Sequence, residues 1–100
     1  MPNKLVRDKI PEIIKSDGKN PITHIASEEE YWDRLKLKLN EEVSEFLEDN
    51  TQEELADILE VIYALCEHKN WSQQEIETIR KIKSEEKGSF EKRIILDRVE

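Results

Sequence analysis

Four acidic residues have a spacing that could hold metal ions. Glu42 and Glu45 form one pair, and Glu54 and Asp57 form a second pair a short distance further along the chain. Residues three positions apart on a helix stand one above the other on the same side. Carboxylate oxygens are ligands that hard cations such as Mg²⁺ or Mn²⁺ prefer. The spacing therefore predicts a metal site wherever two helices bring these pairs together.

The segments around these pairs have the start signals of helices. Each of three segments opens with a Ser or Thr that is followed three residues later by Glu, a pair that satisfies free backbone N–H groups. The sequence predicts helices over residues 28–49, 52–69 and 73–87, joined by turns short enough for antiparallel neighbours. A shorter helical segment is expected between Pro11 and Gly18. The expected fold class is all-α, an antiparallel helical bundle.

Short extended segments are expected at the two ends of this bundle. Residues 21–26 alternate apolar and polar side chains and predict an extended stretch or minor strand that covers an edge of the helices. The tail over residues 90–96 is apolar enough to pack, so we expect it to cross the bundle or a partner subunit.

Helical periodicity predicts that the four carboxylates meet. Glu42 and Glu54 each lie at the margin of the apolar side of their helix, and Glu45 and Asp57 lie further out in the same direction. When two antiparallel helices pack through their apolar sides, these margins share one edge. The two pairs also lie at matching heights from the turn at residues 49–50. Four carboxylates at close range need a cation if all are to stay ionised.

Two plainer interpretations remain open at this point. The chain contains 24 acidic residues, and an acidic pair spaced by three usually marks a solvated helix face. Glu54 could also serve as the reciprocal partner of Thr51 in a helix capping box.

Composition limits the class of protein. One hundred residues with 36% hydrophobic content predict a single domain over residues 1–100 with a small core, so a homodimer or homotetramer is expected. The net charge of -8 disfavours a nucleic-acid polymer or an anionic membrane as partner, and a polyanionic ligand would need bound cations. The single cysteine, Cys66, predicts a buried free thiol in a reducing compartment. Without a membrane span or signal peptide, we expect a cytoplasmic protein.

Basic residues could bind the phosphate oxygens that a metal leaves free, although ordinary surface charge is the alternative for each. These candidates are Lys4, Arg7, Lys9, Lys83 and Lys87.

Aromatic and imidazole side chains suggest little chemistry. Trp32 or Trp71 could stack on a nucleobase, but core packing and a contact with Ile76 at a helix start are the favoured interpretations. His24 and His68 have no metal-ligand spacing and are interpreted as structural or exposed.

The acidic motif resembles a known signature. Residues 41–45, Glu-Glu-Val-Ser-Glu, followed by residues 54–57, Glu-Leu-Ala-Asp, are similar to the EExxE…ExxD motif of the all-α nucleoside triphosphate pyrophosphohydrolases, the MazG-like superfamily. Residues 4–11 and 57–65 resemble its phosphoribosyl-ATP pyrophosphohydrolase-like branch. Residues 87–90, Lys-Gly-Ser-Phe, resemble a basic glycine-rich loop of that branch, with Lys for Arg and Ser for the second Gly.

This resemblance implies a function and a set of site residues. Glu42, Glu45, Glu54 and Asp57 would be metal ligands and catalytic residues, with Glu41 in a supporting role. The expected activity is Mg²⁺-dependent cleavage of a nucleotide between its α and β phosphates, which releases a nucleoside monophosphate and pyrophosphate. A house-cleaning role on free (d)NTPs is expected. The alternatives are the phosphoribosyl-ATP pyrophosphohydrolase of histidine biosynthesis and a non-catalytic helical dimerisation module.

Overall fold

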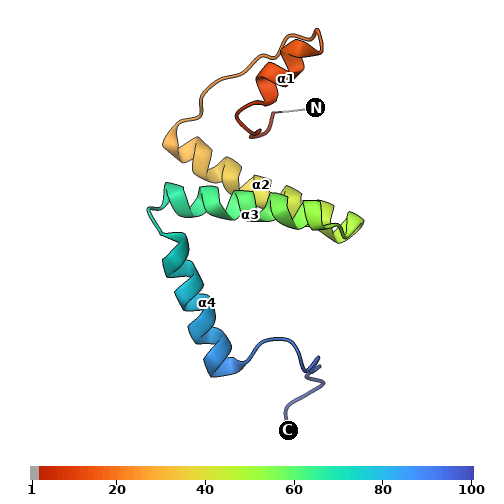
Figure 1. Ribbon diagram of the computed structural model, residues 1–100, viewed down its shortest axis with the longest axis vertical. Coiled ribbons are helices and arrows are strands. Elements are labelled where there is room, and N and C mark those ends of the chain that lie inside the picture. Colours follow the sequence, from red (N-terminus) through yellow and green to blue (C-terminus); the bar gives the residue numbers. More distant parts are fainter. Residues whose placement is uncertain (1–2) are drawn as a thin grey trace.

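Residues 3–100, the part of the chain that the computed structural model describes, contain helices and no strand (Figure 1). The predicted all-α fold class is therefore confirmed. The four helices in chain order are α1 (Ile10–Ser16), α2 (Glu28–Asp49), α3 (Gln52–His68) and α4 (Gln73–Lys87).

The ends of the helices follow from local side chains. Ser27, Thr51 and Ser72 each accept a hydrogen bond from the backbone N–H three residues later, which confirms the predicted starts of α2, α3 and α4. Asn50 ends α2 in the left-handed conformation at φ 56°, and Gly18 follows α1 at φ 81°. The predicted bounds of the three longer helices hold to within one residue.

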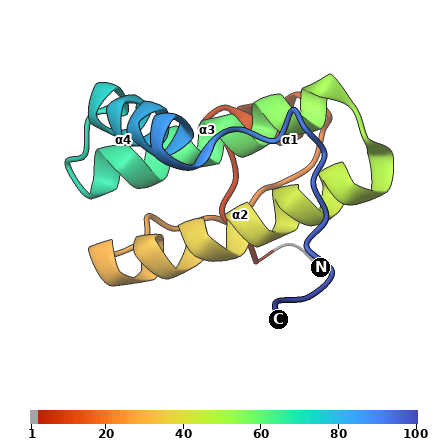
Figure 2. The same ribbon diagram turned by 90° about the horizontal axis from the view of Figure 1, so that it is seen from below.

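Helices α2 and α3 form an antiparallel hairpin that contains the core (Figures 1 and 2). Leu35 of α2 packs at 1% exposure, and Val61 and Cys66 of α3 are also buried. The buried, unpaired Cys66 agrees with its predicted state. The open end of the hairpin is closed by Trp32, which stacks on His68 with ring centroids 5.6 Å apart. Both side chains therefore have a structural role, as interpreted from the sequence.

Helix α4 departs from the expected antiparallel packing. It leaves the hairpin at a steep angle, and within the described residues the main helix–helix packing is that of α2 on α3 (Figure 1). None of the residues of α4 is buried, and the stripe formed by Ile76, Ile79 and Ile82 is 38%, 52% and 48% exposed. A short turn keeps the end of α3 close to the start of α4, but the angle between the two helices depends on the backbone conformation of the turn. Here that turn includes Asn70 in the left-handed conformation.

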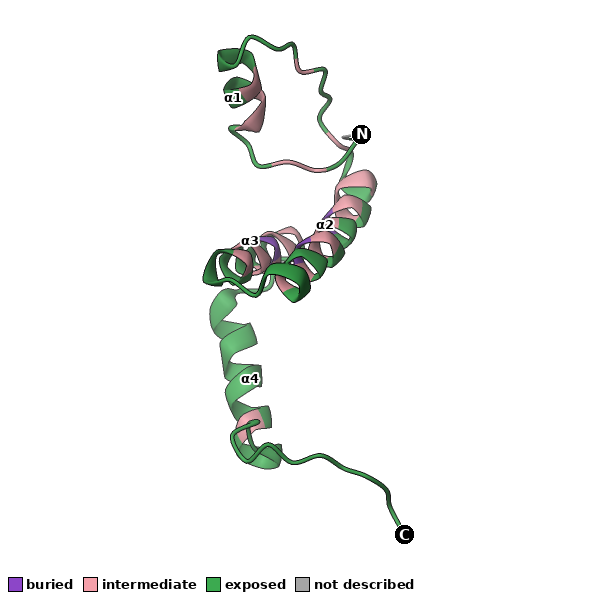
Figure 3. Ribbon diagram, turned by 90° about the vertical axis from the view of Figure 1, so that its right-hand side faces the viewer, coloured by how far each residue is buried: buried purple, intermediate pink, exposed green. Residues whose placement is uncertain are grey.

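The two extended segments do not cover the bundle (Figure 3). Ile22 and Ile25 are 92% and 96% exposed, so the expectation that residues 21–26 cover an edge of the helices is wrong for this chain. Too few apolar side chains in this short stretch face the hairpin to offset the loss of backbone freedom. The C-terminal tail is also exposed, with Phe90 at 97% and Leu96 at 76%, and it does not cross its own bundle. Packing on a partner subunit stays a prediction.

Across residues 3–100, each helix falls short of the length or the apolar character that a bilayer crossing requires.

Candidate metal centre

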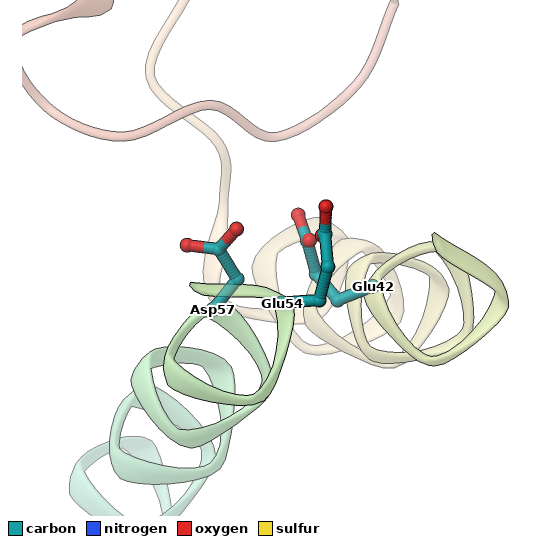
Figure 4. Close-up of side chains that lie close together, drawn as sticks. All are labelled: Glu42, Glu54 and Asp57. Atoms are coloured by element: carbon teal, nitrogen blue, oxygen red, sulfur yellow. The ribbon is translucent and has the colours of Figure 1, made fainter. Parts of the chain in front are cut away.

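The hairpin brings together three of the four predicted carboxylates (Figure 4). Glu42 extends from α2, while Glu54 and Asp57 extend from the first turns of α3. One oxygen atom from each side chain lies within 4.8 Å of the corresponding oxygens of the other two. The three groups, called here the carboxylate trio, point to the same side of the hairpin (Figure 4). Oxygen donors at this spacing fit a hard divalent cation.

Glu42 distinguishes this cluster from a solvated acidic face. Its residue exposure is 7%, and its Oε2 atom is buried without a hydrogen-bond partner. Its Oε1 atom lies 3.3 Å from Nζ of Lys38, which is itself mostly buried. A buried carboxylate oxygen without a partner is destabilising, and native proteins rarely retain one. A cation held by the trio would compensate this buried carboxylate.

The side chain of Glu54 is not used for helix capping. Thr51 accepts a hydrogen bond from the Glu54 backbone N–H, but the reciprocal bond, from the Thr51 backbone N–H to the Glu54 carboxylate, is absent from α3. In α4 the Ser72–Glu75 pair makes both bonds, which shows what the full capping box looks like in this chain. The Glu54 carboxylate instead faces Glu42 and Asp57 (Figure 4). Burial raises its pKa, and the charges of Asp49 and Asp57 raise it further.

Glu45 lies beside the carboxylate trio and not within it. Hydrogen bonding to the Glu42 carboxylate would favour a protonated Glu45, and repulsion by the same group adds to this, so the pKa of Glu45 is raised. Sequence reasoning missed Asp49, whose charge acts on Glu54. Its position four residues after Glu45 on α2 places it on the same helix face, a signal that could have identified it.

The raised pKa values of Glu45 and Glu54 predict a pH-dependent metal effect. A carboxyl group whose pKa is raised by folding stabilises the metal-free protein at pH values below the ordinary pKa of 4.5. This contribution is lost as the pH rises through the raised pKa. Metal binding needs the ionised form. The rise in Tm caused by Mg²⁺ should therefore be greatest near neutral pH and should shrink before pH 4.5 is reached. Thermal unfolding with and without Mg²⁺ across this range measures it, and a constant difference would contradict it.

Basic side chains from the N-terminal segment contact this region. Nζ of Lys4 lies 3.0 Å from Oε1 of Glu41, and Nη2 of Arg7 lies 2.7 Å from Oδ1 of Asp57. Glu41 also pairs with Lys38 at 3.4 Å, and the hydrogen bond from Lys4 lowers its pKa. Glu41 therefore contacts cations next to the trio, a position that suits the supporting role predicted for it. Lys38 is a neighbour of the cluster that sequence reasoning did not identify.

The other predicted phosphate-binding residues do not reach the trio. Lys9 is exposed, and it makes no ion pair with the residues that the structure describes. Lys83 and Lys87 belong to α4, which starts at the end of α3 opposite to the trio and runs away from the hairpin (Figure 1). Within one chain, the direction of α4 therefore keeps these two lysines away from the carboxylates.

The aromatic and histidine candidates also lie elsewhere. Trp71 is half-exposed at the start of α4, and His24 pairs with Glu30 at 3.0 Å.

Comparison with known proteins identifies one similar stretch. No family model and no solved structure matches the chain. A protein of Mycolicibacterium smegmatis, described as uncharacterized, is 44% identical over 50 residues, which are 50% of this chain and 51% of that protein. The chain therefore spans about half the length of the curated relative that it matches. Similarity of this extent carries no activity over to the chain.

Proposed function

We propose that this chain is a Mg²⁺-dependent nucleotide pyrophosphohydrolase that cleaves its substrate between the α and β phosphates. The observation that supports this most is the carboxylate trio with the buried, unpartnered Oε2 of Glu42. The resemblance of residues 41–45 and 54–57 to the MazG-like signature links this cluster to nucleotide hydrolysis. The net charge of -8 fits an enzyme that approaches a polyphosphate through bound cations.

Each group near the trio has a proposed task. Glu42, Glu54 and Asp57 would hold Mg²⁺, and Mn²⁺ would fit the same ligands. When bound, the ion would neutralise phosphate charge and activate water for in-line attack on phosphorus. Glu45 would complete the ligand set by turning toward the trio. Arg7, whose ion pair with Asp57 supports a position beside the metal, would donate to phosphate oxygens.

The substrate class is proposed from the resemblance alone. House-cleaning hydrolysis of free (d)NTPs is our first choice, and phosphoribosyl-ATP is the alternative substrate. We also propose a homodimer or homotetramer, because the apolar stripe of α4 and the C-terminal tail are exposed in the single chain. The same exposure favours the second candidate function, a non-catalytic helical dimerisation module.

Hydrolysis assays test this proposal directly. The purified protein is incubated with Mg²⁺ and a panel of ribo- and deoxynucleoside triphosphates plus phosphoribosyl-ATP, and the release of monophosphate and pyrophosphate is followed. We expect Mg²⁺-dependent turnover that falls by about a hundredfold or more in Glu54→Gln. Loss of a residue that binds the metal directly should lower the rate more than loss of a residue that only hydrogen-bonds to a metal ligand.

Glu53→Gln is the matched control, because Glu53 is exposed, neighbours Glu54 on α3 and undergoes the same change of charge. Equal turnover in the two variants, or none in the wild-type protein, would favour the dimerisation module.

A further inference from the structure

Arg7 forms an ion pair with a carboxylate group that the proposed metal ion would also bind. Its Nη2 atom lies 2.7 Å from Oδ1 of Asp57, and its Nη1 atom lies 3.9 Å from Oε1 of Glu60. Asp57 belongs to the carboxylate trio. A guanidinium group and a divalent cation both seek the same carboxylate oxygens, and they repel each other when close. The Arg7–Asp57 ion pair and a fully coordinated metal are therefore in competition.

The segment that contains Arg7 contacts α2 and α3 through ion pairs and hydrogen bonds that other charged partners can replace. Residues 3–9 form neither helix nor strand. Lys4 pairs with Glu41 at 3.0 Å, and Arg34 donates to the backbone oxygen of Asn3 at 2.6 Å. The side chains of Lys4 and Arg7 are 51% and 55% exposed, so solvent weakens their ion pairs. The N-terminal ribbon passes above the three carboxylates in Figure 4.

We propose that residues 3–9 form a displaceable strap over the metal centre. In the metal-free protein, Arg7 supplies positive charge to Asp57. A divalent cation would bring twice that charge and would be shared with Glu42 and Glu54, with which Arg7 makes no ion pair. Metal binding thus detaches Arg7 from Asp57 and loosens the strap. The released guanidinium then faces the site, where phosphate oxygens are its next partners. This inference rests on the proposed function for the identity of the metal centre.

Metal affinity measured without substrate tests the competition. Mn²⁺ binding is titrated by calorimetry in the wild-type protein, in Arg7→Gln and in Lys9→Gln. We expect Arg7→Gln to bind Mn²⁺ about two- to fivefold more tightly, which is the gain from removing one exposed competing ion pair. Lys9→Gln removes the same charge from the last residue of the strap, which is exposed and makes no ion pair with the described residues, so it measures the general electrostatic effect and should bind nearly as the wild type does. Weaker binding by Arg7→Gln, or equal binding by the two variants, would overturn the strap.

Hydrogen exchange provides a second readout. The backbone amide of Ile10 donates to the carbonyl oxygen of Arg7 at 3.0 Å, so it should exchange faster when Mg²⁺ is added to the wild-type protein, and in Arg7→Gln it should exchange fast without metal. Unchanged exchange on addition of metal would overturn the strap. The two proposals fail separately. If metal loosens the strap but no nucleotide is hydrolysed, only the proposed function fails, whereas hydrolysis with no change in exchange removes only the strap.

Discussion

Mg²⁺ at a hundred times its dissociation constant should stabilise the wild-type chain by about 2.7 kcal/mol, and Glu42→Gln should remove most of this gain. For a domain of this size the wild-type effect corresponds to a rise in Tm of about 10–20 °C. Glu42 is decisive because it is the buried member of the trio and its Oε2 has no hydrogen-bond partner. A neutral amide is a much weaker ligand for a hard cation than a carboxylate. Thermal unfolding monitored by circular dichroism, with and without Mg²⁺, measures the effect.

The metal-free variant provides a second expectation for the same residue. Glutamine removes the buried negative charge that repels Glu45 and Glu54, and Lys38 keeps its ion pair with Glu41 at 3.4 Å. Metal-free Glu42→Gln should therefore be at least as stable as the wild-type protein. Glu48→Gln, at an exposed position of α2, is the matched control and should keep the full response to Mg²⁺. If Glu42→Gln and Glu48→Gln respond to Mg²⁺ equally, the trio does not bind the ion.

Leu35→Ala should destabilise the chain by about 2–5 kcal/mol. Leu35 is 1% exposed, and the buried apolar core within the described residues otherwise consists of Val61 and Cys66. A small domain is typically stable by about 5–15 kcal/mol, so this one cavity would remove a large part of the total. The hairpin that positions Glu42 depends on the same core, and the stabilisation by Mg²⁺ should therefore fall as well. Urea unfolding followed by circular dichroism measures the change.

Leu37→Ala is the control for this core prediction. Leu37 lies on the same helix but is 60% exposed, so its truncation should change stability by no more than about 0.5 kcal/mol. Measurements at several protein concentrations separate folding from association. An equal loss of stability in the two variants at high concentration only would place Leu37 in a subunit interface. Equal losses at every concentration would contradict the core described above.

The sequence by itself determined the helices and most of the candidate metal centre. Ser27, Thr51 and Ser72 marked the helix starts because capping is a local interaction between residues three positions apart. The apolar periodicity of two adjacent segments was enough to predict which faces meet across a short turn. It therefore placed Glu42 near Glu54 and Asp57, as the structure does.

Only the tertiary structure decided the direction of the helices and the contacts between residues that are distant in the sequence. The position of Glu45 beside the trio and the burial of Glu42 Oε2 depend on side-chain packing between α2 and α3, which a helical wheel does not represent. Arg7 and Asp57 are 50 residues apart, and no local pattern pairs them. Helix α4 was expected to pack on α3, but the backbone of its turn sends it away from the hairpin. Periodicity specifies the face that a helix buries, whereas the partner it meets is determined by the path of the whole chain.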